Sequence, residues 1–138
     1  MVLHSGSLEL RGDHYHGAWV PVRLKSPSGF NVQSGLVDTG ADQTLVPRKV
    51  IAALALVRIG DTLVSGVVSE NGVVKEQPEH TFRADEVEVG GYRVFNVEVT
   101  PFDLDFVLVG RDILNDLVLH YDGPGLAFTL TDPSTTSP

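Results

Sequence analysis

The sequence predicts an all-β domain with one or two short helices. Its 138 residues, of which 42% are hydrophobic and 20% charged, suit one globular domain with a proper core and are too few for two domains. Apolar and polar residues alternate over several segments, as they do in strands with one buried face. Turns that contain glycine or proline separate these segments. We place the domain at residues 1–130 and predict a disordered polar tail at residues 131–138.

Strands in the first half of the chain are predicted mainly from this alternation. Pro21 lies within one of them, which suggests an edge strand or an N–H position that faces solvent. A short amphipathic helix is predicted at residues 47–56, because Pro47 suits a first helical turn and apolar residues recur on one face. The predicted strands of this half are residues 7–11, 19–24 and 30–37.

Hairpins are predicted for the second half. Asn71 and Gly72 supply the two positive-φ positions of a tight turn after a strand at residues 62–68. We expect Pro78 to interrupt the returning strand between residues 76 and 80. The other predicted elements are strands at 81–89, 92–99, 107–109, 118–121 and 126–130, and a short helix at 111–117.

Composition excludes several classes of partner and cofactor. The net charge is −8, and the ten Lys and Arg residues are scattered, with only Arg48 and Lys49 adjacent, which argues against a nucleic-acid partner. Without cysteine the chain has no disulfide, thiol nucleophile or thiolate metal site. No apolar stretch is long enough to span a membrane, and no signal peptide is evident at the N-terminus. We therefore expect a cytoplasmic protein with no membrane contact and no cofactor.

A metal site is one possible use of two nearby histidines. His14 and His16 flank Tyr15, and residues two apart on a strand share a face, so the pair could hold a metal ion. No acidic or cysteine partner lies at ligand spacing, which favours a solvated turn. We expect no metal.

The residues with most chemical interest begin where an apolar run stops. Leu36 and Val37 lead into Asp38-Thr39-Gly40, so a strand would carry the Asp38 carboxylate to the edge of a packed sheet. Thr39 and Gly40 can form a turn whose backbone N–H groups point back at that carboxylate. Glycine beside the acid leaves room for a substrate or a second chain. The alternative is an ordinary Asx turn that closes a strand.

Two motifs resemble those of the retropepsin-like aspartic proteases. Asp38-Thr39-Gly40-Ala41 resembles the active-site segment, and residues 106–114 resemble the apolar-Gly-Arg-Asp-apolar-Leu signature that follows it. The resemblance covers roughly residues 18–121 and is nearest to the cellular and bacterial members. It implies a closed β-barrel of the acid protease fold, assembled as a two-fold homodimer, that hydrolyses a polypeptide substrate.

The resemblance also assigns roles to the motif residues. Asp38, Thr39 and Gly40 are the catalytic residues, with Thr39 hydrogen-bonded across the dimer. Ala41 must be small to keep the cleft open, and Asp42 binds the substrate main chain and pairs with Arg111.

Further roles concern support and closure of the cleft. Gly110 and Asp112 join Arg111 in supporting the catalytic loop, through a partly buried, bidentate bridge from Arg111 to Asp42. The hairpin between the two motifs corresponds to the flap that closes over bound peptide, and Gly66 and Gly72 allow it to open and contact substrate. An apolar cleft is expected from Val64, Val67, Val68 and Val107.

Hydrolysis by carboxylates needs two of them, which share one proton. The chain has one Asp-Thr-Gly motif, so the second Asp38 would come from a second chain across a two-fold axis. Two alternatives stay open: a non-catalytic retropepsin-fold module for dimerisation or peptide binding, and an unrelated β-barrel binding domain. The chain also departs from the viral pattern, because 27 residues follow Arg111 and the flap lacks a glycine-dense tip.

Overall fold

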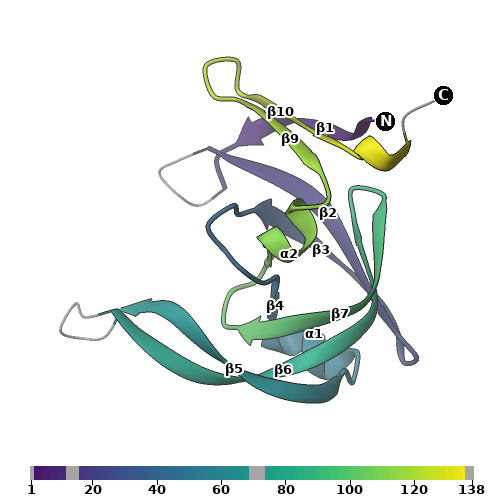
Figure 1. The fold of residues 1–138 in the computed structure, drawn as a ribbon, viewed down its shortest axis with the longest axis vertical. Coiled ribbons are helices and arrows are strands. Elements are labelled where there is room, and N and C mark those ends of the chain that lie inside the picture. Colours follow the sequence, from purple (N-terminus) through teal and green to yellow (C-terminus); the bar gives the residue numbers. More distant parts are fainter. Residues whose placement is uncertain (1, 12–15, 69–73, 136–138) are drawn as a thin grey trace.

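The computed structural model describes residues 2–11, 16–68 and 74–135. Most of them lie in strands, with two short helices (Figure 1). The strands are β1 Val2–Glu9, β2 Gly17–Ser26, β3 Gly29–Val37, β4 Leu45–Pro47, β5 Val57–Val68, β6 Val74–Val89, β7 Tyr92–Phe102, β8 Val107–Val109, β9 Val118–Asp122 and β10 Ala127–Thr131. The helices are α1 Arg48–Ala53 and α2 Arg111–Leu114, and Pro133–Thr135 form a 3-10 turn. The expected mostly-β architecture with few short helices is confirmed.

The strands pair in the order β5-β6-β7-β4-β8-β3-β2-β1-β10-β9. Most neighbours are antiparallel, but β3 pairs with β8 and β4 pairs with β7 in parallel. β6 also pairs with β2 through residues 86–89 and 22–25. The six strands from β6 to β2 therefore follow one another around the core.

Alternation explains which side chains form that core. Along β2 every second residue is buried, from Ala18 to Ser26, while the residues between them are mostly exposed. Phe128 and Leu130 of β10 add their side chains to the same cluster. Its other fully buried members include Val20, Val22, Leu24, Val46, Val50, Val87, Val89, Val99, Val107, Val109 and Ile113.

Several predicted boundaries differ from the structure. β1 spans Val2–Glu9 where residues 7–11 were predicted, and β5 begins at Val57 where residue 62 was predicted. Pro78 does not interrupt β6, which runs unbroken from Val74 to Val89. Pro78 pairs with Leu63 of β5, whereas β6 meets β7 only from Phe82 onward. Pro78 therefore has a strand on one side only, where the missing N–H is tolerated. The three-residue strand β4 was not predicted, because so short a segment carries no period.

The tail also begins later than predicted. Thr131 belongs to β10, and Asp132 is buried. The Asp132 carboxylate accepts hydrogen bonds from the N–H and hydroxyl of Ser134, at 2.9 and 2.6 Å. These bonds lower the pKa of Asp132 and order the 3-10 turn. Residues 131–135 of the segment predicted as a disordered tail thus include the end of β10 and the 3-10 turn, and residues 136–138 lie outside the described residues.

The sheet made by β1, β10 and β9 lies at the opposite end of the molecule from the long β5–β6 hairpin (Figure 1). β3, with which β8 pairs, and α2 lie between these two ends (Figure 1). Within the described ranges, no helix is both long and apolar enough to cross a membrane.

Candidate functional site

A cleft of about 350 Å³ lies between the loop after β3 and the first half of the β5–β6 hairpin. Four separate segments build its walls, so no single motif in the sequence describes it. Its described lining residues are Asp38, Gly40, Ala41, Asp42, Gln43, Leu45, Thr62, Leu63, Val64, Thr100 and Leu108.

Asp38 reaches this cleft at the end of a buried strand pair. Leu36 and Val37 of β3 pair in parallel with Leu108 and Val109 of β8. The next backbone N–H, that of Asp38, donates to the carbonyl oxygen of Val109 at 3.0 Å. The hydrogen bonds between β3 and β8 end at this residue. The Asp38 side chain is half-buried and lines the cleft. Strand pairing therefore fixes the position of the carboxylate.

A tight turn then orients that carboxylate. The N–H of Gly40 donates to Asp38 Oδ1 at 2.9 Å, and the N–H of Ala41 donates to the Asp38 carbonyl oxygen at 3.2 Å. The turn predicted at Thr39 and Gly40, with a backbone N–H that points back at the carboxylate, is thus present, and it has the hydrogen bond of an Asx turn. A Cβ on residue 40 would lie 3.2 Å from Asp38 Oδ1, so glycine lets the loop stay close to the acid.

Gly110 allows the second motif to lie directly against this loop. A Cβ at position 110 would meet the carbonyl carbon and oxygen of Gln43 at 2.6 Å, and the carbonyl oxygen of Ala41 at 3.0 Å. Both neighbours are backbone, which cannot move aside without shifting the loop. The φ angle of Gly110 is −92°, so glycine is needed here for space.

Asp112 is the side chain that holds the loop most directly. Its carboxylate accepts hydrogen bonds from the N–H of Thr44 at 3.0 Å and from the Thr44 hydroxyl at 2.8 Å. Two backbone bonds lie beside it: Arg111 N–H to the Ala41 carbonyl at 2.8 Å, and Asp112 N–H to the Asp42 carbonyl at 3.3 Å. Asp112 also lies in the first turn of α2, as predicted.

The pair between Arg111 and Asp42 differs from its prediction. The two side chains do form an ion pair, but through one nitrogen, Nη2, and one oxygen, Oδ1. Their side chains are 48% and 83% exposed. The partly buried, bidentate bridge is therefore wrong, because the loop turns Asp42 toward solvent. An exposed pair of this kind contributes at most about 1 kcal/mol, so the backbone bonds and Asp112 are the stronger support.

We expect Asp112→Asn to lower the free energy of unfolding by about 2 kcal/mol, because it leaves one Thr44 donor facing an amide NH₂ group. Asp42→Asn is the matched control, and we expect a loss below about 1 kcal/mol. Urea denaturation of both variants measures the difference. Equal losses would contradict the assignment of loop support to Asp112.

Several lining residues were not predicted from the sequence. Gln43 and Thr100 meet inside the cleft, where the Thr100 hydroxyl donates to Gln43 Oε1 at 2.8 Å. Leu45, Leu63 and Leu108 supply apolar surface. Gln43 follows the recognised motif directly, so its place in the sequence could have marked it. Thr100 and Thr62 have no such signal, because only the strand order brings them to the loop.

The remaining predicted residues have mixed outcomes. Thr39 is exposed beside Asp38, and Ala41 lines the cleft as expected. Val64 lines it too, but Val107 is fully buried in the core and Leu108 points into the cleft instead. Three successive apolar residues give no alternation that could have shown this. Gly66 lies in β5 beyond Val64.

Some predictions fall where the structure gives no test. Gly72 and His14 lie outside the described residues, and so do the side chains of Val67 and Val68. Among the residues that are described, no group of three His, Asp or Glu side chains could hold a metal ion.

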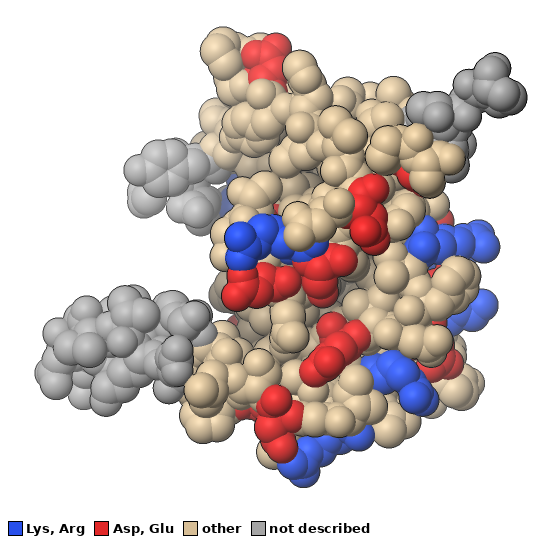
Figure 2. All heavy atoms as spheres, viewed as in Figure 1, with Lys and Arg blue, Asp and Glu red and all other residues tan. Residues whose placement is uncertain are grey.

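On the face of the molecule drawn in Figure 2, positive and negative side chains mostly lie together. Figure 2 shows Lys and Arg in separate patches, most of them beside Asp or Glu. Among the described residues, Arg111 pairs with Asp42 and Lys49 pairs with Asp105.

Comparison with known proteins gives one family match and several similar solved structures, two of which follow. A family model described as gag-polyprotein putative aspartyl protease matches residues 30–116. The structure is similar to a retropepsin-like aspartic protease from Rickettsia conorii, at 15% sequence identity and a TM-score of 0.58, covering 94% of this chain and 93% of that one. It is also similar to a foamy viral protease-reverse transcriptase at 20% identity and a TM-score of 0.55, covering 72% of this chain but 12% of the viral chain. A search among curated proteins returned no match.

Proposed function

Because the chain belongs to the gag-polyprotein putative aspartyl protease family, we propose that it is an aspartic endopeptidase, active as a homodimer. Asp38 of each chain would supply one of the two catalytic carboxylates. The observation that carries this proposal is the delivery of Asp38, oriented by Gly40, into a cleft with apolar walls. Asp38→Asn is the direct test.

The composition of the cleft supports the need for a second chain. Among its described lining residues, only Asp38 and Asp42 carry carboxylates, and Asp42 is paired with Arg111. A shared-proton pair needs two carboxylates about 3 Å apart. A two-fold axis beside the exposed Thr39 would bring two copies of Asp38 together, and a threonine can both donate and accept in a symmetric contact.

The reaction would divide the work between these two carboxylates. The ionised Asp38 takes a proton from a water molecule, and the oxygen of that water attacks the peptide carbonyl carbon. The protonated Asp38 donates to the carbonyl oxygen, where negative charge develops. As the carbon–nitrogen bond breaks, the leaving nitrogen receives the proton that the first Asp38 took from water, and the second Asp38 takes its proton back from the former carbonyl oxygen. Leucine side chains at positions 45, 63 and 108 favour apolar residues beside the scissile bond.

The fold supports two further parts of this proposal. The pairing of β6 with both β7 and β2 is what the closed barrel requires. The β5–β6 hairpin supplies Thr62, Leu63 and Val64 to one wall, which suits a flap over bound peptide. Gly66 and Gly72 remain the proposed flexible positions in that flap.

We expect cleavage of a denatured protein mixture to be fastest on the acid side of neutrality. One proton is shared by the pair there, and the rate should fall as the second Asp38 ionises. Rates measured between about pH 3 and 8 test this. A rate that rises without limit toward alkaline pH would contradict a shared-proton pair. Peptide binding with no cleavage at any pH would point to a binding module instead.

A further inference from the structure

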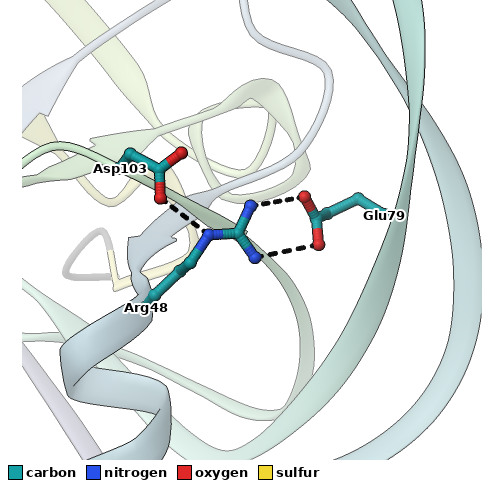
Figure 3. Close-up of polar contacts among 3 residues, drawn as sticks. All are labelled: Arg48, Glu79 and Asp103. Carbon is teal, nitrogen blue, oxygen red and sulfur yellow. Dashed lines mark hydrogen bonds and ion pairs between the residues drawn. The ribbon is translucent and has the colours of Figure 1, made fainter.

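Arg48 joins three segments that each supply a residue to the cleft. Its guanidinium donates through Nη1 and Nη2 to the two carboxylate oxygens of Glu79, at 3.0 and 2.5 Å, and through Nε to Asp103 Oδ1 at 2.7 Å (Figure 3). Three of the five N–H donors of the planar group are thus matched to carboxylate oxygens. This three-residue group lies outside the cleft, because none of its members is a lining residue.

Each of these three residues is close, in sequence or across a strand pair, to a residue that lines the cleft. Arg48 opens α1 directly after β4, whose residue Leu45 lines the cleft. Asp103 directly follows β7, which supplies Thr100. Glu79 of β6 pairs in register with Thr62 of β5, a third lining residue.

The β5–β6 register shows what Glu79 can control. Residues 60–64 pair regularly with residues 77–81, and Glu79 is the middle of that second segment. The register shifts on either side, between Arg58 and Gly60 and again between Val64 and Val67. Bulges interrupt the ladder and bend a strand, so the regular segment is a distinct block. That block carries Thr62, Leu63 and Val64 into the cleft.

We propose that Arg48 is a positioning residue that holds this block of the hairpin at a fixed distance from the catalytic loop. The proposal rests on the proposed peptidase function. Arg48 touches neither the reacting atoms nor the cleft; it acts through Glu79 and Asp103.

Charge and burial agree with this role. The Glu79 side chain is 14% exposed, whereas that of Arg48 is 47% exposed. The guanidinium lowers the pKa of Glu79 below its ordinary value of 4.5, and the two carboxylates raise that of Arg48. Because the pKa of Glu79 is lowered, the pair is complete above pH 4.5 and is lost only as the pH falls through the lowered value. The contact is therefore complete over the part of the acid range that lies above pH 4.5.

Arg48→Met tests the proposal, with Lys49→Met as the matched control. Lys49 is the next residue of α1 and also pairs with the loop after β7, at 2.8 Å from Asp105, but both side chains are exposed. We expect Arg48→Met to raise KM for a peptide substrate about tenfold while kcat changes less than about threefold. Lys49→Met should leave both constants unchanged.

Two further variants make the test specific. Glu79→Gln should reproduce the rise in KM. Adding it to Arg48→Met should have little further effect, because each substitution alone already removes the Arg48–Glu79 contact. Arg48→Lys should be intermediate, because a lysine keeps the charge without the planar fork. Arg48→Lys also serves as the test if Arg48→Met does not fold.

Amide hydrogen exchange gives a second readout that needs no catalysis. In Arg48→Met we expect faster exchange at residues 60–64 and 77–81, with the β9–β10 hairpin unchanged. If the wild type cleaves nothing, the peptidase function fails, and exchange alone decides whether Arg48 holds the hairpin. Unchanged exchange in the two segments, or an unchanged KM in an active enzyme, would overturn the proposal.

Discussion

Replacing Asp38 with asparagine is expected to abolish peptide cleavage, by about 10³-fold or more, because each active site would lose both carboxylates of the pair. Asparagine keeps the size of the side chain, and its carbonyl oxygen can still accept the Gly40 N–H bond seen at 2.9 Å. We therefore expect stability to change little. Cleavage of a denatured protein mixture, with products identified by mass spectrometry, measures the loss.

Asp105→Asn is the matched control for this substitution. Asp105 is an 87% exposed carboxylate on the loop after β7, is paired with Lys49, and is not among the lining residues. Its removal should leave cleavage unchanged. Full activity in Asp38→Asn would contradict the proposed function.

Mixing the wild-type and Asp38→Asn proteins then tests whether the active site is shared between chains. In a dimer with one Asp38 from each chain, any pair that contains an Asp38→Asn chain lacks one carboxylate. After subunit exchange, total activity should fall as the square of the wild-type fraction. A linear decrease would mean that each chain is active alone, which would contradict the shared site.

Gly110→Ala is expected to lower the free energy of unfolding by about 3 kcal/mol, the upper range for overpacking in a rigid site. The added methyl group would lie 2.6 Å from two backbone atoms of Gln43. To make room, the loop that holds Asp38 must separate from α2, so cleavage should fall as well. The shift in the urea concentration at the midpoint of unfolding gives the stability change when the slope of free energy against urea concentration is the same in both proteins.

Gly123→Ala controls for the general effect of replacing a glycine. A Cβ at position 123 would have one neighbour within 4 Å, the Tyr121 ring at 3.8 Å, which is an ordinary contact. We expect a change of less than about 0.5 kcal/mol. If Gly110→Ala were as stable as Gly123→Ala, the close approach of the two motifs would not be needed.

Local structure could be predicted from the sequence wherever a few neighbouring residues determine it. The Asx turn at Asp38 follows from an acid, a hydroxyl residue and a glycine in a row, because their hydrogen bonds are made within three residues. The strand that delivers Asp38 was likewise predicted at 30–37 and found at Gly29–Val37.

Residues that meet only through strand order could not be predicted. Thr100 reaches Gln43 because β7 pairs with β4, and β4 is too short to show a period. In the apolar run of β8, Val107 is buried and Leu108 lines the cleft, a choice made by the parallel pairing with β3.

By itself, the sequence determined the mostly-β class, the acid-bearing turn and the resemblance that the family match confirms. Only the tertiary structure decided that Asp112 supports the loop more directly than the exposed Arg111–Asp42 pair. It also decided that Arg48 connects α1 to β6. The physical reason is that burial and long-range hydrogen bonds depend on how distant strands are stacked, whereas turns and strand periods depend on neighbours along the chain.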